Sequence, residues 1–170
     1  MQFEGRVYYD FSAQVWRFYR FLAAAGKKGA DLRLDWRSFL VNDEPQSAAG
    51  LALVESVRRS APERHGLFLQ ALLALHHLDG ADLTDPRTAA AAADAAGING
   101  VIEPSPDAVT ASTEEGRALG VSGTPTIHRH GPVLRVDVNP ASYEGDVLER
   151  LGRIAAVMED DGIWLLEKPG

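Results

Sequence analysis

Apolar and polar positions along the chain predict an ordered series of strands and helices. A short apolar and aromatic run over 7–11 is typical of a buried strand. Capping oxygens over 10–12 then precede a broad apolar helix face, which ends at the Ala-Gly-Lys-Lys-Gly stretch over 25–29. Apolar residues at alternate positions over 32–36 have the period of a strand with one wet face. The first part of the chain is therefore predicted as strand, helix, strand.

The middle of the chain changes to helical periodicity, from residue 46 to about 119. Asp85-Pro86 marks one helix start by capping and by proline in the first turn, and Gly97 marks the stop of that helix. The alanine run over 89–93 belongs to this helix, and another short helix is predicted over 107–119. Several helices are therefore expected between the two strand-containing parts of the chain.

The last part of the chain returns to strands and closes with a helix. Ile127 and the segment 133–138 supply two strands around a turn at His130-Gly131, and the segment 143–158 supplies the helix. This order predicts an α/β protein with three parts: a βαβ half over 1–45, an all-helical insert over 46–119 and a ββα half over 120–170.

Composition narrows the classes of function. A chain of 170 residues with 45% apolar content fits one globular domain. A formal net charge of −7 with scattered basic residues argues against a nucleic-acid surface. The sequence contains no apolar run of the ~20 residues that cross a membrane, and its first five residues lack the order of a signal peptide. We therefore expect a cytoplasmic protein without nucleic-acid or membrane partners.

The most informative stretch is Gly-Val-Ser-Gly-Thr-Pro-Thr-Ile over 120–127, where a proline stands just before an apolar strand. Proline cannot donate a hydrogen bond to a sheet, so it belongs at a strand start or an edge. An X-Pro bond also adopts the cis form at modest cost. A cis bond between Thr124 and Pro125 would turn the Thr124 backbone outward as a docking edge for an extended ligand.

This octapeptide resembles the cis-proline loop of thioredoxin-fold proteins, above all of the DsbA-like family. In that family the loop lies beside a Cys-x-x-Cys motif at the start of the first helix, and the segment 6–18 resembles the corresponding strand, turn and helix. The resemblance implies a thioredoxin fold (βαβ…ββα) with an inserted all-helical subdomain, and oxidoreductase activity in its relatives. Weaker similarity to FrnE-type relatives and to actinobacterial mycothiol-dependent nitroreductases is carried by 32–42, 131–134, 143–146 and 164–168.

The family's two cysteines are missing. Counted from Asp10, the nucleophilic position is Ala13 and the resolving position is Trp16, and the whole chain has no cysteine. Disulfide exchange needs a thiolate to attack and a second thiol to resolve the mixed disulfide. Self-contained dithiol chemistry is therefore excluded.

The start of the first helix remains a candidate binding site, because a helix amino terminus presents unpaired N–H groups and a partial positive charge. Kappa-class glutathione transferases and chromene-carboxylate isomerases resemble this architecture and place a serine at the nucleophilic position, which is Ala13 here. Ser12 is one residue earlier, so we interpret it as a helix cap and only a weak catalytic candidate. Trp16 either fills the core or covers a bound aromatic group. The predicted ligand-binding residues are Ser12, Ala13, Gln14, Trp16, Thr124 and Pro125.

The histidines do not predict a metal site. His76 and His77 are adjacent on a helix, so their side chains should point about 100° apart and not face one site. His128 and His130 would share one face of a strand, without a third ligand in view. His65 lies in a polar stretch and is expected to be solvated.

Three functions remain open from the sequence. The leading interpretation is a DsbA-like relative that has lost the redox dithiol and binds a ligand or partner, either a small thiol or an extended peptide. The first alternative is an oxidoreductase or transferase that uses an exogenous sulfur from mycothiol or glutathione as its cofactor. The second alternative is a structural homodimer subunit that pairs through an exposed sheet edge.

Overall fold

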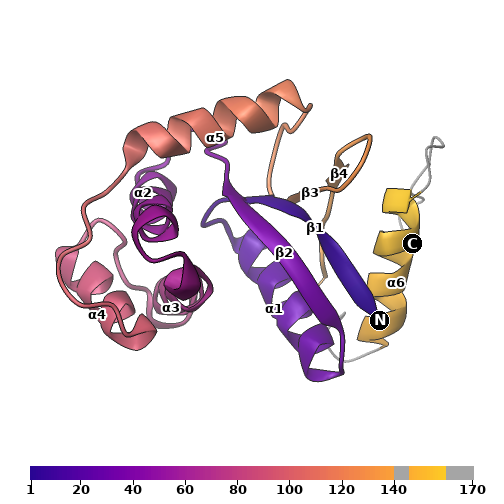
Figure 1. Ribbon diagram of the computed structural model, residues 1–170, viewed down its shortest axis with the longest axis horizontal. Helices are drawn as coiled ribbons and strands as arrows, with labels where there is room; N and C mark the ends of the chain where they lie inside the picture. The colour runs from indigo at the N-terminus through magenta and orange to yellow at the C-terminus, as the bar shows by residue number, and fades with distance from the viewer. Residues whose placement is uncertain (140–145, 160–170) are drawn as a thin grey trace.

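Four strands form one sheet in the order β2-β1-β3-β4. β1 pairs in parallel with β2, whereas β1–β3 and β3–β4 are antiparallel. The computed structural model describes residues 1–139 and 146–159 and is shown in Figure 1. Its elements are β1 (Gln2–Tyr9), α1 (Ala13–Lys27), β2 (Asp31–Ser38), α2 (Pro45–Ser60), the 3-10 turn η1 (Pro62–Arg64), α3 (His65–Asp79), α4 (Pro86–Ala96), α5 (Pro106–Ala118), β3 (Thr126–His128), β4 (Leu134–Arg135) and α6 (Val147–Glu159).

Local sequence signals set the helix boundaries. Ser12 caps α1, Glu44 caps α2 and Asp85 caps α4, each with a side-chain oxygen that accepts from backbone N–H groups of the first turn. At the other end, α3 stops at Gly80 and α4 stops at Gly97, both in the left-handed conformation that glycine adopts without strain. The predicted start and stop of the helix over 86–96 are confirmed.

The helices form two groups, one packed on the sheet and one beyond its end. α1 and α6 pack together on one face of the sheet, and their apolar residues join those of β1 and β3 in one core. α2, α3 and α4 gather beyond the end of the sheet, while α5 runs from that group back to the strands (Figure 1). Their own core includes Phe11 and Val15, which come from the turn before α1 and from α1 itself. The first turn of α1 therefore lies between the two cores.

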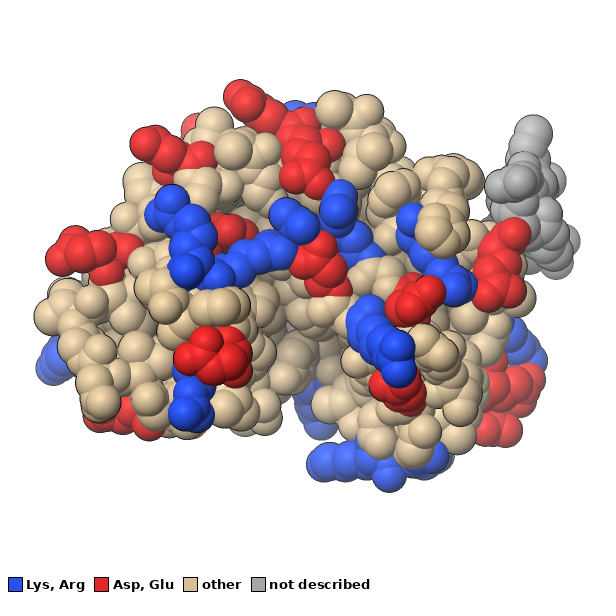
Figure 2. All heavy atoms as spheres, in the orientation of Figure 1, with Lys and Arg blue, Asp and Glu red and all other residues tan. Residues whose placement is uncertain are grey.

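Charged side chains on the β2 face are paired with one another. The Asp35 carboxylate receives Arg37 at 2.8 Å and Arg6 at 3.4 Å, and it also pairs with Arg58 of α2. Burial alone would raise the pKa of Asp35, but the Arg37 hydrogen bond and the neighbouring arginine charges hold it below its ordinary value. Figure 2 shows acidic and basic side chains interspersed across this view of the molecule. The arginines of this face thus serve pairing within the fold.

His65 is half-buried, with its Nε2 enclosed and without a hydrogen-bond partner, so the prediction of a solvated side chain is wrong. Burial first, and then the charge of Arg58, lower the pKa of His65. The start of the predicted closing helix, at 143–145, and the motifs at 143–146 and 164–168 lie outside the described residues, apart from residue 146. No helix among the described residues is long and apolar enough to cross a bilayer.

Gly50 provides a test of the contact between α2 and the turn before α1. A Cβ at this position would lie 2.6 Å from Cε2 of Phe11. We expect Gly50→Ala to reduce the free energy of unfolding by about 1–2 kcal/mol in urea titrations, because overpacking outweighs the gain in helix propensity. Gly66 of α3 is the matched control, since nothing lies within 4 Å of its Cβ position. Gly66→Ala should leave stability unchanged or raise it by about 0.5 kcal/mol, and equal losses in both variants would contradict this packing.

Candidate functional site

The candidate site is built on the short turn between β1 and α1. Asp10 Oδ1 accepts the Ser12 N–H at 3.0 Å, and the Phe11 N–H donates to Ser47 Oγ of α2 at 3.1 Å. Asp10, Phe11 and Ser47 are all buried. The turn is therefore held both by its own carboxylate and by the helical insert.

The first residues of α1 present open backbone donors. Ser12 Oγ accepts the Val15 N–H at 3.5 Å, which confirms that Ser12 is the helix cap. Ala13 and Gln14 are exposed, and no described residue accepts a hydrogen bond from either amide. Unpaired N–H groups at a helix amino terminus favour a negatively charged group. This turn can therefore bind an anion, although its nucleophilic position carries only a methyl group.

The loop before β3 borders the same end of the sheet. The peptide bond between Thr124 and Pro125 is cis. β1 and β3 pair Tyr8 with Thr126, and the same antiparallel register continued by one residue places Pro125 opposite Tyr9, the last residue of β1. The structure thus brings the loop to the strand end from which the turn before α1 begins.

The loop before β3 is partly buried and lies beside a cationic side chain. Thr124 is only 5% exposed, less than the predicted outward-turned backbone implies. The guanidinium of Arg135 lies against Gly123, where a Cβ would be 2.2 Å from Nη1 and would displace the arginine. The Pro125 carbonyl accepts the Val136 N–H at 3.0 Å, which ties the loop to the segment that carries Arg135. A positive charge therefore stands beside the loop.

Aromatic side chains join the site to the helical insert in a closed circuit of seven rings. Trp16 stacks on Tyr19 with centroids 6.1 Å apart and on His77 at 5.4 Å, with interplanar angles of 7° and 10°. The neighbouring pairs that complete the circuit are Tyr19–Trp36, Trp36–Tyr9, Tyr9–Phe11, Phe11–His76 and His76–His77. Every ring of the circuit contacts two others. The circuit therefore packs together β1, the turn before α1, α1, β2 and α3.

The two histidines of α3 both belong to this circuit, although their rings lie against different partners. Their ring centroids are 4.7 Å apart, with His76 against Phe11 and His77 against Trp16. The two side chains leave α3 in different directions but join the same cluster of rings. His76 contacts the turn before α1, and His77 contacts the first turn of α1. The sequence carries one signal of this enclosed environment: α3 has no charged residue over 66–75, just before these histidines.

His77 is a neutral packing residue at ordinary pH. Burial lowers its pKa to about 4 and the neighbouring His76 contributes in the same direction, against the opposing effects of the Phe11 carbonyl and the Asp10 carboxylate. Its Nε2 is enclosed and has no hydrogen-bond partner. Trp16, predicted either to pack or to cover a ligand, is half-buried and packs, with the Arg20 guanidinium 6.0 Å from its ring centroid.

Beneath the turn, Tyr9 is fully buried and remains protonated, because burial raises its pKa strongly. The buried Ser38 hydroxyl donates to Glu55 at 2.7 Å in the same region. Among the described residues, no cluster of three acidic or histidine side chains could hold a metal ion. The described residues therefore support recognition of a ligand by the open N–H groups of Ala13 and Gln14 and by the positive charge of Arg135. The aromatic rings pack beside this surface.

Comparison with solved structures identifies the fold. A probable DsbA oxidoreductase from Streptomyces coelicolor superposes with a TM-score of 0.64 at 15% identity, covering 96% of this chain and 94% of that chain. A periplasmic thioredoxin-like protein from Salmonella enterica serovar Typhimurium gives a TM-score of 0.62 at 16% identity, with 88% and 84% covered. A cytosolic disulfide reductase, DsbM, from Pseudomonas aeruginosa, solved with GSH, gives 0.56 at 15%, with 92% and 99% covered.

These similarities confirm the predicted fold class: a thioredoxin fold with an inserted helical subdomain, as in DsbA-like proteins. No family model matches the sequence, and no curated protein is similar to it in sequence. At these identities the fold alone is shared, so the chemistry of this chain has to be argued from its own residues.

The low pKa of His77 predicts a pH dependence of stability. The neutral ring stabilises the folded state fully above pH 6.5, the ordinary value, and this contribution is lost as the pH falls towards about 4. We expect the native protein to lose about 1–2 kcal/mol more unfolding free energy between pH 7 and pH 4.5 than His77→Phe, allowing for partial solvent screening. His130 is exposed and serves as control. Urea titrations in which His77→Phe keeps the full pH dependence, and His130→Phe does not, would contradict this assignment.

Proposed function

We propose that this protein is a non-redox binding protein of the DsbA-like fold. Its ligand is an extended, peptide-like molecule with an anionic group placed at the amino terminus of α1. The observation that carries the proposal is the pair of open amides at Ala13 and Gln14, whereas the N–H groups of Phe11, Ser12 and Val15 all have described acceptors. The Arg135 guanidinium beside Gly123 supplies positive charge on the loop side of the same strand end.

The side chains at the site support the non-redox part of the proposal. Ala13 stands at the position of the attacking sulfur, and the chain has no cysteine that could replace it. The nearest hydroxyl, on Ser12, is engaged in capping α1. An adjacent base is one way to activate a serine hydroxyl. The Asp10 carboxylate accepts the Ser12 N–H, and among the described residues no base accepts a hydrogen bond from the Ser12 hydroxyl.

A small thiol tripeptide is the simplest ligand of the proposed kind. The structural neighbour from Pseudomonas aeruginosa was solved with GSH, which is peptide-like and carries carboxylates. In this chain a carboxylate would accept from the Ala13 and Gln14 amides, and the backbone of the ligand would run towards Thr124. Since Thr124 is 5% exposed, the anionic end should contribute most of the affinity.

A thiol-dependent oxidoreductase or transferase is the second candidate, because the methyl side chain of the exposed Ala13 leaves space for a sulfur brought by glutathione or mycothiol. This candidate would also suit the FrnE-type or mycothiol-dependent branch suggested by the sequence. A sheet-edge homodimer has less support. Arg58 Nη1 donates to the Trp36 carbonyl at 2.8 Å, and this contact occupies part of the free edge of β2.

Titration calorimetry with glutathione and S-methylglutathione tests the binding proposal. Both should bind with similar affinity, because the anionic groups and not the sulfur are recognised. We expect Ala13→Asp to weaken both about tenfold or more through charge repulsion, while stabilising α1 by up to about 1 kcal/mol. Ala23→Asp, at an exposed position later in α1, is the matched control and should bind normally. Absence of heat and of a thermal shift at millimolar glutathione would refute the proposal.

The two candidates differ in their need for sulfur. If glutathione binds at least tenfold more tightly than its S-methyl derivative and supports insulin reduction above that of glutathione alone, the thiol-dependent enzyme is correct and the non-redox protein is not. Equal binding of the two peptides, with no added reduction, supports the non-redox protein. Reduction by the protein without any added thiol would contradict both.

A further inference from the structure

A hollow lies in the helical insert, on the side of α2 that faces α4. It has a volume of about 490 Å³ and is bounded by α2, by the start and middle of α4, and by the segment 100–104. Folded proteins pack closely, and their ligand sites fall in the range of about 300–1,000 Å³. The hollow is therefore of the size of a small-molecule site, and the site at the start of α1 does not include it.

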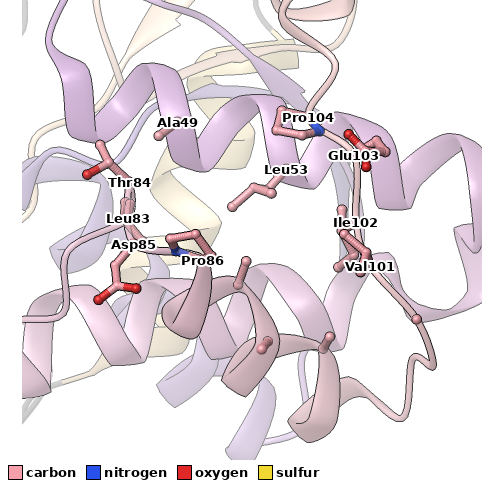
Figure 3. Close-up of a pocket in the computed structure, with 14 residues that line it drawn as sticks. Ala49, Leu53, Leu83, Thr84, Asp85, Pro86, Val101, Ile102, Glu103 and Pro104 are labelled. Atoms are coloured by element: carbon pink, nitrogen blue, oxygen red, sulfur yellow. The ribbon is translucent and has the colours of Figure 1, made fainter.

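Small side chains leave this space unfilled. α4 contributes Ala89, Ala90 and Ala93 to the wall, opposite Leu53 of α2. Figure 3 shows Leu53 between two ends of the hollow, with Thr84 and Asp85 at one end and Glu103 and Pro104 at the other. Longer side chains on this face of α4 would close the gap, so the alanine run creates an elongated apolar floor.

Hydrogen bonds fix the walls at both ends. The Ile98 N–H donates to the Ala93 carbonyl at 2.9 Å and the Ser105 N–H to the Ala52 carbonyl at 2.9 Å, which anchors the segment between them. At the other end, the Leu83 N–H donates to Gln46 Oε1 of α2 at 2.7 Å. A ligand would therefore enter a preformed site, where little ordering opposes binding.

The charged side chains at the two ends of the hollow determine where the polar group of a ligand would bind. Asp85 already caps α4 and pairs with Arg87 at 2.7 Å. Glu103 is exposed and makes no hydrogen bond or ion pair with a described residue. Among the described residues, no lysine or arginine lines the hollow. Glu103 would repel an anionic head at its end of the hollow, whereas an ammonium group could pair with it.

We propose that this hollow binds an elongated aliphatic amine, with its tail over Leu53 and the α4 alanines and its ammonium group at Glu103. The recognition chemistry is apolar burial along the floor and one charge pair at the rim. This site is separate from the one proposed to bind a peptide-like anion, so either assignment can fail without the other.

Calorimetric titration of the full chain with octylamine, octanol and octanoate at pH 7 tests the proposal. Octylamine should bind saturably and about three- to tenfold more tightly than octanoate, as expected for a rim charge pair. Glu103→Gln should bring octylamine to the affinity of octanol without altering packing. Octanoate binding as tightly as octylamine, or no saturable binding of octylamine, would overturn the proposal.

Two alanines of α4 locate the binding. Ala90 lines the hollow and Ala91 does not, and both are exposed, so Leu at either position should fold equally well. We expect Ala90→Leu to weaken octylamine binding about tenfold or more by filling the hollow, and Ala91→Leu to leave it within about twofold. Equal affinity in the two variants would place the amine elsewhere and overturn the assignment.

Discussion

The circuit of seven aromatic rings between the sheet and the helical insert is the contact on which the arrangement of the site depends. It joins Trp16 and Tyr19 of α1 to Trp36 of β2 and to the α3 histidines. Aromatic pairs at such distances contribute beyond the area that they bury, by about 0.5–1.5 kcal/mol each. Trp16 stands where the Cys-x-x-Cys motif has its resolving thiol, and in this chain that position serves packing.

The candidate site lies at the start of α1, and the chain supplies no cysteine to it. Asp10 and Ser47 hold the turn, Ser12 caps the helix, and the loop at Pro125 lies at the same strand end. Removal of the thiol does not remove the electrostatics of the helix terminus, since those come from backbone N–H groups. Recognition of an anionic, peptide-like ligand is therefore the property that the described residues support best.

Local patterns predicted the order of the elements, because caps, glycine stops and apolar periods act within a few residues. Ser12 as a cap and the helix over 86–96 are examples. They did not give every bound, since the strand expected over 7–11 is Gln2–Tyr9 and the one expected over 133–138 is only Leu134–Arg135. The long-range contacts were not predictable in this way. The meeting of His77 with Trp16 depends on how α3 crosses α1, and the cover over Thr124 depends on packing that no local pattern encodes. Similarly, the alanine run predicted a helix but not the hollow that its small side chains leave.

The most direct test of the central claim is the amide chemical shift of the first turn of α1 during titration with S-methylglutathione, followed in a ¹⁵N-labelled sample. The account predicts saturable shifts at the amides of Ala13 and Gln14, with smaller shifts near Gly123 and little change in α4. Saturable shifts confined to other regions, with Ala13 and Gln14 unmoved, would show that the retained turn is not the binding site.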